Sequence, residues 1–222
     1  MLALVDNKTV IQIPTYSYKN NKVFIPHSDS DYDNMFTSMG FELVDNIEDA
    51  HLVCFTGGSD IDPHLYQQTN VASYTNYTRD DQEISYFKTC IKLHKPMVGV
   101  CRGGQLLNVL SGGSMWQDVP NHSGDVQHSV RLSTGEEMQV NSEHHQQMIL
   151  GPAGILIAYV DEVLNRLSDT GYHFKREKSV EVAWYPNTRS LCFQPHPEWN
   201  SSPEGMTDWF FELIEAYCFN PT

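Results

Sequence analysis

Cys101 lies at the centre of the segment Gly99-Val100-Cys101-Arg102-Gly103, where a cysteine can act as a nucleophile. The pattern is the thiol counterpart of the G-x-S-x-G elbow of serine hydrolases, a sharp turn from a strand into a helix. The flanking glycines fit such a turn because the two backbones approach so closely that a Cβ atom has no room. A lone cysteine is more often a small buried hydrophobic residue. The elbow favours a nucleophile instead, since unpaired N–H groups and the dipole at a helix N-terminus lower the pKa of a thiol.

A cysteine nucleophile needs a base that also protonates the leaving group, and a third group that orients this base. His196 has the right setting, because it follows a predicted buried strand, lies between Pro195 and Pro197, and precedes Glu198 by two residues. In an extended backbone, residues i and i+2 project to the same side, so the Glu198 carboxylate can reach the far nitrogen of the imidazole. The sequence therefore predicts a triad of Cys101, His196 and Glu198.

The chain has ten histidines, and two adjacent ones, His144 and His145, are candidate metal ligands by residue type. No cysteine or carboxylate stands near them at the spacing that zinc sites use. We therefore predict that both line a pocket, and that the protein holds no metal and no other cofactor. Seven further histidines are interpreted as surface or core residues: His27, His51, His64, His94, His122, His128 and His173.

Two continuous apolar runs, over residues 50–56 and 96–100, are predicted to position this chemistry. Such runs suit parallel strands covered on both faces, and open α/β sheets place ligand sites beyond the carboxyl ends of their strands. The second run leads directly into Cys101. The first ends at Gly57-Gly58, which is either a plain turn or a turn whose N–H stays bare to approach an oxyanion.

The remaining pattern predicts an α/β fold with a mostly parallel central sheet, helices on both faces and a small antiparallel addition. Helices are expected over residues 31–39, from a capping box at residues 80–83, after Cys101, and from residue 202 to the C-terminal region. An opening core strand is expected over residues 9–14, with residues 2–5 as its competitor, and residues 16–30 as a loop or weak hairpin. Further strands are expected over residues 41–44, 126–132, 137–140, 154–160, 180–184 and 191–194.

Composition limits the function classes that the chain can belong to. A length of 222 residues with 40% hydrophobic residues suffices for one sizeable α/β domain, so we predict a single domain over residues 1–222. The formal charge of −14 argues against binding to nucleic acid or to an anionic membrane surface. Five cysteines without a C-x-x-C pair indicate reduced thiols. With no basic leader and no apolar run of the ~18–20 residues that span a membrane, a cytoplasmic protein is expected.

From about residue 49 to residue 198, the chain resembles the class I glutamine amidotransferases. Within them it is most similar to the γ-glutamyl hydrolase branch (peptidase C26), which acts on compounds such as γ-glutamyl-γ-aminobutyrate. Six blocks occur in the family's order: FTGGSDIDPHLY, RDDQE, VGVCRGGQLLNVLSGGSMWQD, QHSVRL, VNSEHHQ and FQPHPE. The resemblance implies the flavodoxin-like fold of that family.

The resemblance also implies a reaction. Cys101 would attack the γ-carbonyl of a small-molecule γ-glutamyl substrate to give a γ-glutamyl thioester. His196 would pass a proton to the departing amine or ammonia, and Glu198 would orient His196. Water would then release glutamate.

Five more positions receive binding roles from the resemblance alone. The backbone N–H groups of Gly58 and Arg102 would hold the oxyanion. Gln105 would help to hold the α-amino and α-carboxylate end of the glutamyl group, and Ser142 and His144 would line the substrate site.

This sequence departs from the family at two places. Pro195 stands where the family usually has an aromatic or bulky residue, and a proline removes a backbone donor and fixes φ. Residues 16–30 also separate the first predicted strand from the first helix, where the family connects the two more directly.

Three functions remain open on the sequence. The chain is a free-standing γ-glutamyl amide hydrolase, or it is the glutaminase subunit that delivers ammonia to a separate synthetase partner; either form can be a homo-oligomer. The third reading, a thiol redox sensor or chaperone on a related fold, is disfavoured because a sensor needs no general acid such as His196.

Overall fold

The structure, a computed structural model, describes residues 2–5, 9–12, 18–124 and 126–220. Its strands are β1 (Leu2–Val5), β2 (Thr9–Gln12), β3 (Lys22–Phe24), β4 (Glu42–Leu43), β5 (Leu52–Phe55), β6 (Met97–Val100), β7 (Ser114–Trp116), β8 (Val126–Leu132), β9 (Glu137–Ser142), β10 (Gln147–Ile149), β11 (Ile155–Ser168), β12 (Gly171–Tyr185) and β13 (Ser190–Phe193). Its helices are α1 (Ser30–Ser38), α2 (Tyr77–Leu93), α3 (Arg102–Leu110) and α4 (Met206–Leu213), with a 3-10 turn at Pro63–Tyr66 and a π-helical segment at Ile214–Phe219.

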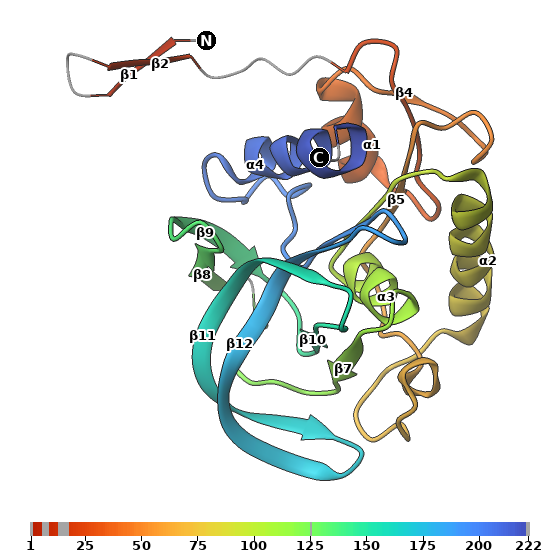
Figure 1. The fold of residues 1–222 in the computed structure, drawn as a ribbon, viewed down its shortest axis with the longest axis vertical. Helices are drawn as coiled ribbons and strands as arrows, with labels where there is room; N and C mark the ends of the chain where they lie inside the picture. The colour runs from red at the N-terminus through yellow and green to blue at the C-terminus, as the bar shows by residue number, and fades with distance from the viewer. Residues whose placement is uncertain (1, 6–8, 13–17, 125, 221–222) are drawn as a thin grey trace.

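The main sheet follows the order β4-β3-β5-β6-β13-β12-β11-β8-β9 (Figure 1). The strands from β4 to β13 run parallel to one another, and the pairs from β12 outward are antiparallel. The predicted α/β class is therefore confirmed. The antiparallel part is larger than expected, because β11 and β12 form a hairpin of 14- and 15-residue strands. The sequence does not predict its outer part, over residues 161–179, because this segment is rich in charged residues and has no continuous apolar run.

Helices cover both faces of the parallel strands, as predicted. Along β5, Leu52 and Cys54 point into a core shared with α1 and α4. Val53 and Phe55 point the other way, into a core shared with α2 and α3. All four side chains are fully buried, which explains why the run is apolar at every position rather than at alternate ones.

The prediction of an opening core strand over residues 9–14 was wrong. Within the described part of the chain, β2 pairs with β1 alone, in a separate antiparallel hairpin (Figure 1), and residues 13–14 lie outside the described residues. The first parallel strand of the main sheet is β3, inside the segment predicted as a loop. It is three residues long, and only its central Val23 is buried, so no periodic pattern reveals it.

Two helices begin elsewhere than predicted. α2 begins at Tyr77, because the side chain of Asn76 caps it by accepting a hydrogen bond from the Arg79 N–H. α4 begins at Met206 after Gly205, which has φ of +82°, and not at residue 202. None of the described helices is long and apolar enough to cross a membrane. All five cysteines are free thiols and buried.

The elbow at Cys101 has the predicted geometry. Cys101 has φ of +49°, a backbone conformation that is uncommon for a residue with a side chain. A Cβ atom on Gly99 would come closer than 3.0 Å to the backbone of Gly103, and a Cβ on Gly103 would come as close to the Phe55 carbonyl. Hydrogen bonds hold the strained turn on both sides. The Cys101 N–H donates to the Phe193 carbonyl over 2.8 Å, and the Cys101 carbonyl accepts from the Gln105 N–H over 2.9 Å.

The elbow makes Gly103 irreplaceable. We expect Gly103→Ala to lower the free energy of unfolding by about 3 kcal/mol or more, because the methyl group meets rigid backbone rather than a movable side chain. The matched control is Gly135→Ala, a turn residue with φ of +100° and nothing within 4 Å of the added atom, for which only the left-handed conformation costs about 1–2 kcal/mol. Urea denaturation followed by circular dichroism measures both losses. Equal losses would contradict the steric argument.

Candidate active site

Three loops at the carboxyl ends of β5, β6 and β13 bring together the predicted nucleophile and base. These strands are neighbours in the sheet, so their ends share one edge. A Cβ atom added to Gly57 would lie 3.1 Å from the His196 ring and 3.8 Å from the Cys101 Cβ, which places both side chains against the same glycine. On its other side, His196 Nδ1 lies 2.7 Å from Glu198 Oε1. The order along the site is Cys101, His196, Glu198.

The charges of this group reinforce one another. Burial by itself lowers the pKa of His196, but the facing Cys101 sulfur and the Glu198 carboxylate outweigh it and raise this pKa to about 10. The imidazole is therefore protonated at neutral pH beside the sulfur. A neighbouring imidazolium favours the thiolate, the nucleophilic form of a cysteine.

The backbone of His196 is held by a residue that sequence reasoning missed. The Asn141 amide donates to the His196 carbonyl over 2.8 Å and accepts from the His196 N–H over 2.8 Å. The Trp199 ring also stacks on the imidazole, with ring centroids 4.1 Å apart and planes within 8°. Asn141 belongs to the block VNSEHHQ, but its partner is 55 residues away in the chain. Nothing in the sequence pairs the two.

Tyr32 is a second residue whose role was not predicted. In the sequence it is only one of the apolar-face residues of the helix that became α1. Its hydroxyl accepts the Gly57 N–H over 3.0 Å. Burial, followed by the Glu198 carboxylate, raises the pKa of the Tyr32 phenol well above its usual value. Tyr32 is therefore a neutral group that fixes the Gly57 turn next to the orienting carboxylate.

Gly58 and Arg102, the two predicted oxyanion donors, flank Cys101. Gly58 has φ of +145°, a backbone conformation that residues with a side chain rarely adopt, and a Cβ atom there would also require the Arg79 guanidinium to move. Within the residues that the structure describes, neither backbone N–H has a hydrogen-bond partner. The Arg102 N–H is free because it belongs to the first residue of α3.

The Arg102 side chain is fully buried, in an ion-pair network. Its guanidinium pairs with Asp80 over 2.5 Å and with Glu83. Glu83 also binds Arg79 over 2.9 Å, and Arg79 donates to the Thr56 carbonyl over 3.1 Å. Asp80 and Glu83 were predicted as a helix cap, and this was wrong, since they lie on the buried face of α2 and anchor the elbow helix. The network also reaches Thr56, directly before Gly57-Gly58.

A cavity of about 140 Å³ opens beside Cys101, and Gln105, His144 and His145 are among its lining residues. The prediction that both histidines line a pocket is confirmed. The cavity is smaller than the roughly 300–1,000 Å³ of sites for drug-sized ligands, so it suits a group of amino-acid size. Ser142 does not line it. Its hydroxyl donates to the His122 carbonyl over 2.8 Å.

Two further contacts shape the cavity wall. The Gln105 amide donates to the Gln194 side chain over 3.2 Å. The His145 ring lies 3.0 Å from Asp60 and 3.2 Å from Asp118, and the hydrogen bond to Asp60 is the main cause that raises the pKa of His145. The wall therefore holds an imidazole between two carboxylates.

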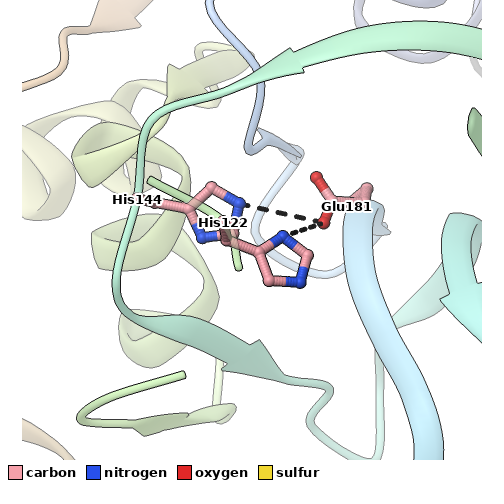
Figure 2. A group of neighbouring side chains, drawn as sticks. All are labelled: His122, His144 and Glu181. Carbon is pink, nitrogen blue, oxygen red and sulfur yellow. Dashed lines mark ion pairs between the residues drawn. The ribbon is translucent and has the colours of Figure 1, made fainter. Parts of the chain in front are cut away.

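Behind His144 lies a buried group that resembles a metal site (Figure 2). His122, His144 and Glu181 each have a ligand-type atom within 4.8 Å of those of the others. They come from the loop after β7, the loop before β10, and β12. The expectation that no carboxylate accompanies His144 was wrong, because it counted residues along the chain and Glu181 arrives from a distant strand. Burial raises the pKa of Glu181 to about 8.

This fold is that of class I glutamine amidotransferase-like proteins. The model of the Peptidase C26 family matches residues 37–162, more than half of the chain, and the chain belongs to that family. The resemblance drawn from the six sequence blocks is thereby confirmed.

Relatives and solved structures agree with this assignment. The chain is 31% identical over 173 residues to the glutamine amidotransferase-like protein YvdE of Lactococcus lactis, covering 73% of this chain and 72% of that protein. It is 26% identical to the gamma-glutamyl-gamma-aminobutyrate hydrolase of Escherichia coli O157:H7, with coverages of 72% and 68%. A glutamine amidotransferase structure from Thermotoga maritima matches with a TM-score of 0.53 at 13% identity, covering 88% of this chain and 82% of that one. This last likeness concerns the fold alone.

The Arg102 network predicts a large loss of stability when one partner is removed. Glu83→Gln leaves the buried guanidinium with one charged partner, and we expect it to lower the free energy of unfolding by about 3–5 kcal/mol. The matched control is Asp161→Asn, which breaks the exposed, two-pronged Arg176–Asp161 pair and should leave stability near the wild-type value. Urea denaturation measures both. A small loss for Glu83→Gln would mean that the buried network does not hold the elbow.

The raised pKa of His196 predicts its titration. In wild type the ring should stay protonated through neutral pH and lose its proton near pH 10, and Cys101→Ala or Glu198→Gln should lower this pKa. Because the folded value exceeds the ordinary 6.5, the stabilisation is full below about pH 6.5 and disappears as the pH rises through about 10. Nuclear magnetic resonance of the ring protons measures the titration. A wild-type ring that titrates near 6.5 would show that the sulfur and carboxylate do not act on it.

Proposed function

We propose that this protein is a cysteine-dependent hydrolase that cleaves the γ-amide bond of glutamine or of a γ-glutamyl compound. The observation that supports it most directly is that the Cys101 side chain faces the His196 ring, which in turn contacts the Glu198 carboxylate. The chain that holds this group belongs to the Peptidase C26 family. The relative in Escherichia coli O157:H7 named a gamma-glutamyl-gamma-aminobutyrate hydrolase supports the γ-glutamyl part of the proposal.

The reaction proceeds in two steps. The Cys101 sulfur attacks the γ-carbonyl carbon, and the carbon–nitrogen bond breaks as His196 gives its proton to the departing amine or ammonia. This leaves a γ-glutamyl thioester. His196 then takes a proton from water, the hydroxide attacks the thioester carbon, and glutamate leaves as the thiol is restored. Glu198 holds the imidazole in the orientation that both transfers need.

The negative oxygen formed in each step rests on backbone donors. The N–H groups of Gly58 and Arg102 have no hydrogen-bond partner among the described residues, and pre-placed donors of this kind stabilise the transition state without having to reorganise. Asp80 and Glu83 act through Arg102, because they fix the helix that carries its N–H. They are positioning residues.

The glutamyl end of the substrate enters the cavity beside Cys101. Gln105 contacts the α-amino and α-carboxylate groups, and the His144 ring forms part of the cavity wall. Ser142 contributes indirectly, through its bond to the segment that carries His122. The proposal includes a single catalytic domain over residues 1–222, in the cytoplasm, that needs no cofactor for this reaction.

The same chemistry serves a glutaminase subunit that passes ammonia to a synthetase partner. Steady-state turnover separates the two functions, because a free-standing hydrolase releases glutamate from γ-glutamyl amides without help. A subunit stays nearly silent until its partner is added. A thiol sensor would show no release in either case.

The decisive experiment is a screen of γ-glutamyl amides for glutamate release, with Cys101→Ala as the blank. We expect Cys101→Ala and His196→Ala to lower kcat by about 10⁵–10⁶-fold, and Glu198→Gln by about 10–100-fold less, because an orienting group matters less than the base. His64→Gln, an exposed histidine with 70% of its side chain accessible, is the matched control and should keep full activity.

Two outcomes would contradict the assignment. Turnover that survives alkylation of Cys101 would mean that the sulfur is not the nucleophile. A larger loss for Glu198→Gln than for His196→Ala would mean that the roles of base and orienting group are exchanged.

A further inference from the structure

Imidazole nitrogens of three histidines surround one oxygen of Glu181, next to the active site. Oε1 of Glu181 lies 3.9 Å from His122 Nδ1, 3.9 Å from His144 Nε2 and 3.8 Å from His128 Nε2. Figure 2 shows the rings of His122 and His144 turned toward the carboxylate. These separations exceed the length of a hydrogen bond, so the groups face one another without being bonded.

The opposite nitrogens of two of these rings are already engaged. His144 Nδ1 lies 2.8 Å from the Gln146 carbonyl, which can only accept, so this nitrogen carries the proton and Nε2 presents a lone pair toward Glu181. His122 Nε2 lies 2.9 Å from the Glu162 carboxylate, and Nδ1 faces Glu181 with the Ser142 hydroxyl 3.5 Å from it. Histidines that bind metal ions in proteins are oriented in this way, by a carboxylate or a backbone carbonyl on the far nitrogen.

The centre of the group has unmatched polar atoms. Among the described residues, none forms a hydrogen bond with His144 Nε2, His128 Nε2 or either oxygen of Glu181. Glu181 and His144 are buried, with 0% and 5% of their surface exposed. A buried carboxylate facing nitrogen lone pairs is costly unless a cation or a proton lies between them.

We propose that His122, His144 and Glu181 bind a divalent metal ion of the zinc type, with His128 as the nearest candidate for a fourth ligand. Two or three imidazoles with one carboxylate are a donor set that suits Zn²⁺. In a tetrahedral site with bonds of about 2.0–2.1 Å, neighbouring ligand atoms lie about 3.3–3.4 Å apart. The observed distances to Glu181 are longer by roughly half an ångström, and the ligand atoms of the three residues lie within 4.8 Å of one another, so the side chains must move together to close the site.

The ion would add a side-chain link from strand β12 to the loops that carry His122 and His144, which are already joined by the hydrogen bond from the His144 N–H to the His122 carbonyl over 2.8 Å. It can enter from two sides, since His144 lines the cavity beside Cys101 and the His128 side chain is 20% exposed. The proposal does not depend on the proposed hydrolase activity. Binding is measured as metal content and affinity, whatever the chain catalyses.

The test uses the purified full chain, stripped with a chelator and titrated with ZnCl₂ by calorimetry, with the metal content measured by mass spectrometry. We expect about one equivalent of Zn²⁺ per chain. The titration is repeated on Cys101→Ala, because a thiolate beside an imidazole is a competing zinc site, and the equivalent should remain. Loss of all binding in Cys101→Ala would overturn the proposal.

Variants of the ligands assign the site. Glu181→Gln and His122→Gln should weaken binding by more than about 100-fold, and Glu162→Gln, which removes the partner of His122, by about 10–100-fold. The matched control is His145→Gln, which changes the neighbour of His144 and should keep wild-type affinity. Unchanged affinity in Glu181→Gln, or affinity lost only in His145→Gln, would overturn the proposal.

Cobalt supplies a measurement that needs no variant, in case a ligand substitution prevents folding. Wild-type chain loaded with Co²⁺ should show the visible absorption of a four-coordinate site with nitrogen and oxygen ligands, and no thiolate charge-transfer band. Zn²⁺ should also raise the melting temperature of wild type, because the ion binds only the folded arrangement. A thiolate band, or a featureless spectrum without any rise in melting temperature, would overturn the proposal.

Discussion

The burial of the Arg102 guanidinium between Asp80 and Glu83 is the interaction on which the geometry of the candidate active site depends. Arg102 directly follows the cysteine, so whatever fixes its side chain also fixes the start of α3 and the backbone N–H beside the sulfur. Glu83 extends the same network through Arg79 to the Thr56 carbonyl, immediately before Gly57-Gly58. Two loops that belong to different strands are thereby held in one frame. A planar guanidinium suits this task because it binds two carboxylates at fixed angles.

The strain of the elbow follows from the same frame. Cys101 keeps φ of +49° because the surrounding backbone leaves no alternative: Gly99 and Gly103 bring strand and helix into contact, and the Phe193 carbonyl holds the Cys101 N–H. A relaxed turn would lower the local energy but would withdraw the sulfur from the edge of the sheet. The free energy that this backbone conformation costs is offset by the buried packing of α3 against β6 and β13. The placement of the candidate nucleophile and the stability of the fold therefore depend on the same few residues.

How much of this was visible in the sequence depended on whether the signal was local. The elbow, the His196–Glu198 pair and the apolar run of β5 are local patterns, each complete within a few residues, and they were predicted. Asn141, Tyr32 and the carboxylates of α2 act on partners far along the chain, and their own neighbourhoods suggested ordinary roles as loop, apolar face and cap. β3 was not predicted for another reason, because its three residues are too few to show an alternating hydrophobic pattern. Glu181 was missed because spacing along the chain says nothing about a ligand from a distant strand.

His144 connects the two polar centres of the molecule. Its ring lines the cavity beside Cys101, and its Nε2 points away toward Glu181, so one imidazole borders both the candidate active site and the candidate metal site. The Gln146 carbonyl fixes the ring, and a ring with one tautomer and one orientation cannot change its contacts on one side without changing them on the other. A cation bound to Nε2 would withdraw electrons from the ring and strengthen the hydrogen bond that Nδ1–H donates. The wall of the cavity would then become more rigid, and substrate that binds there would meet a more strongly pre-organised site.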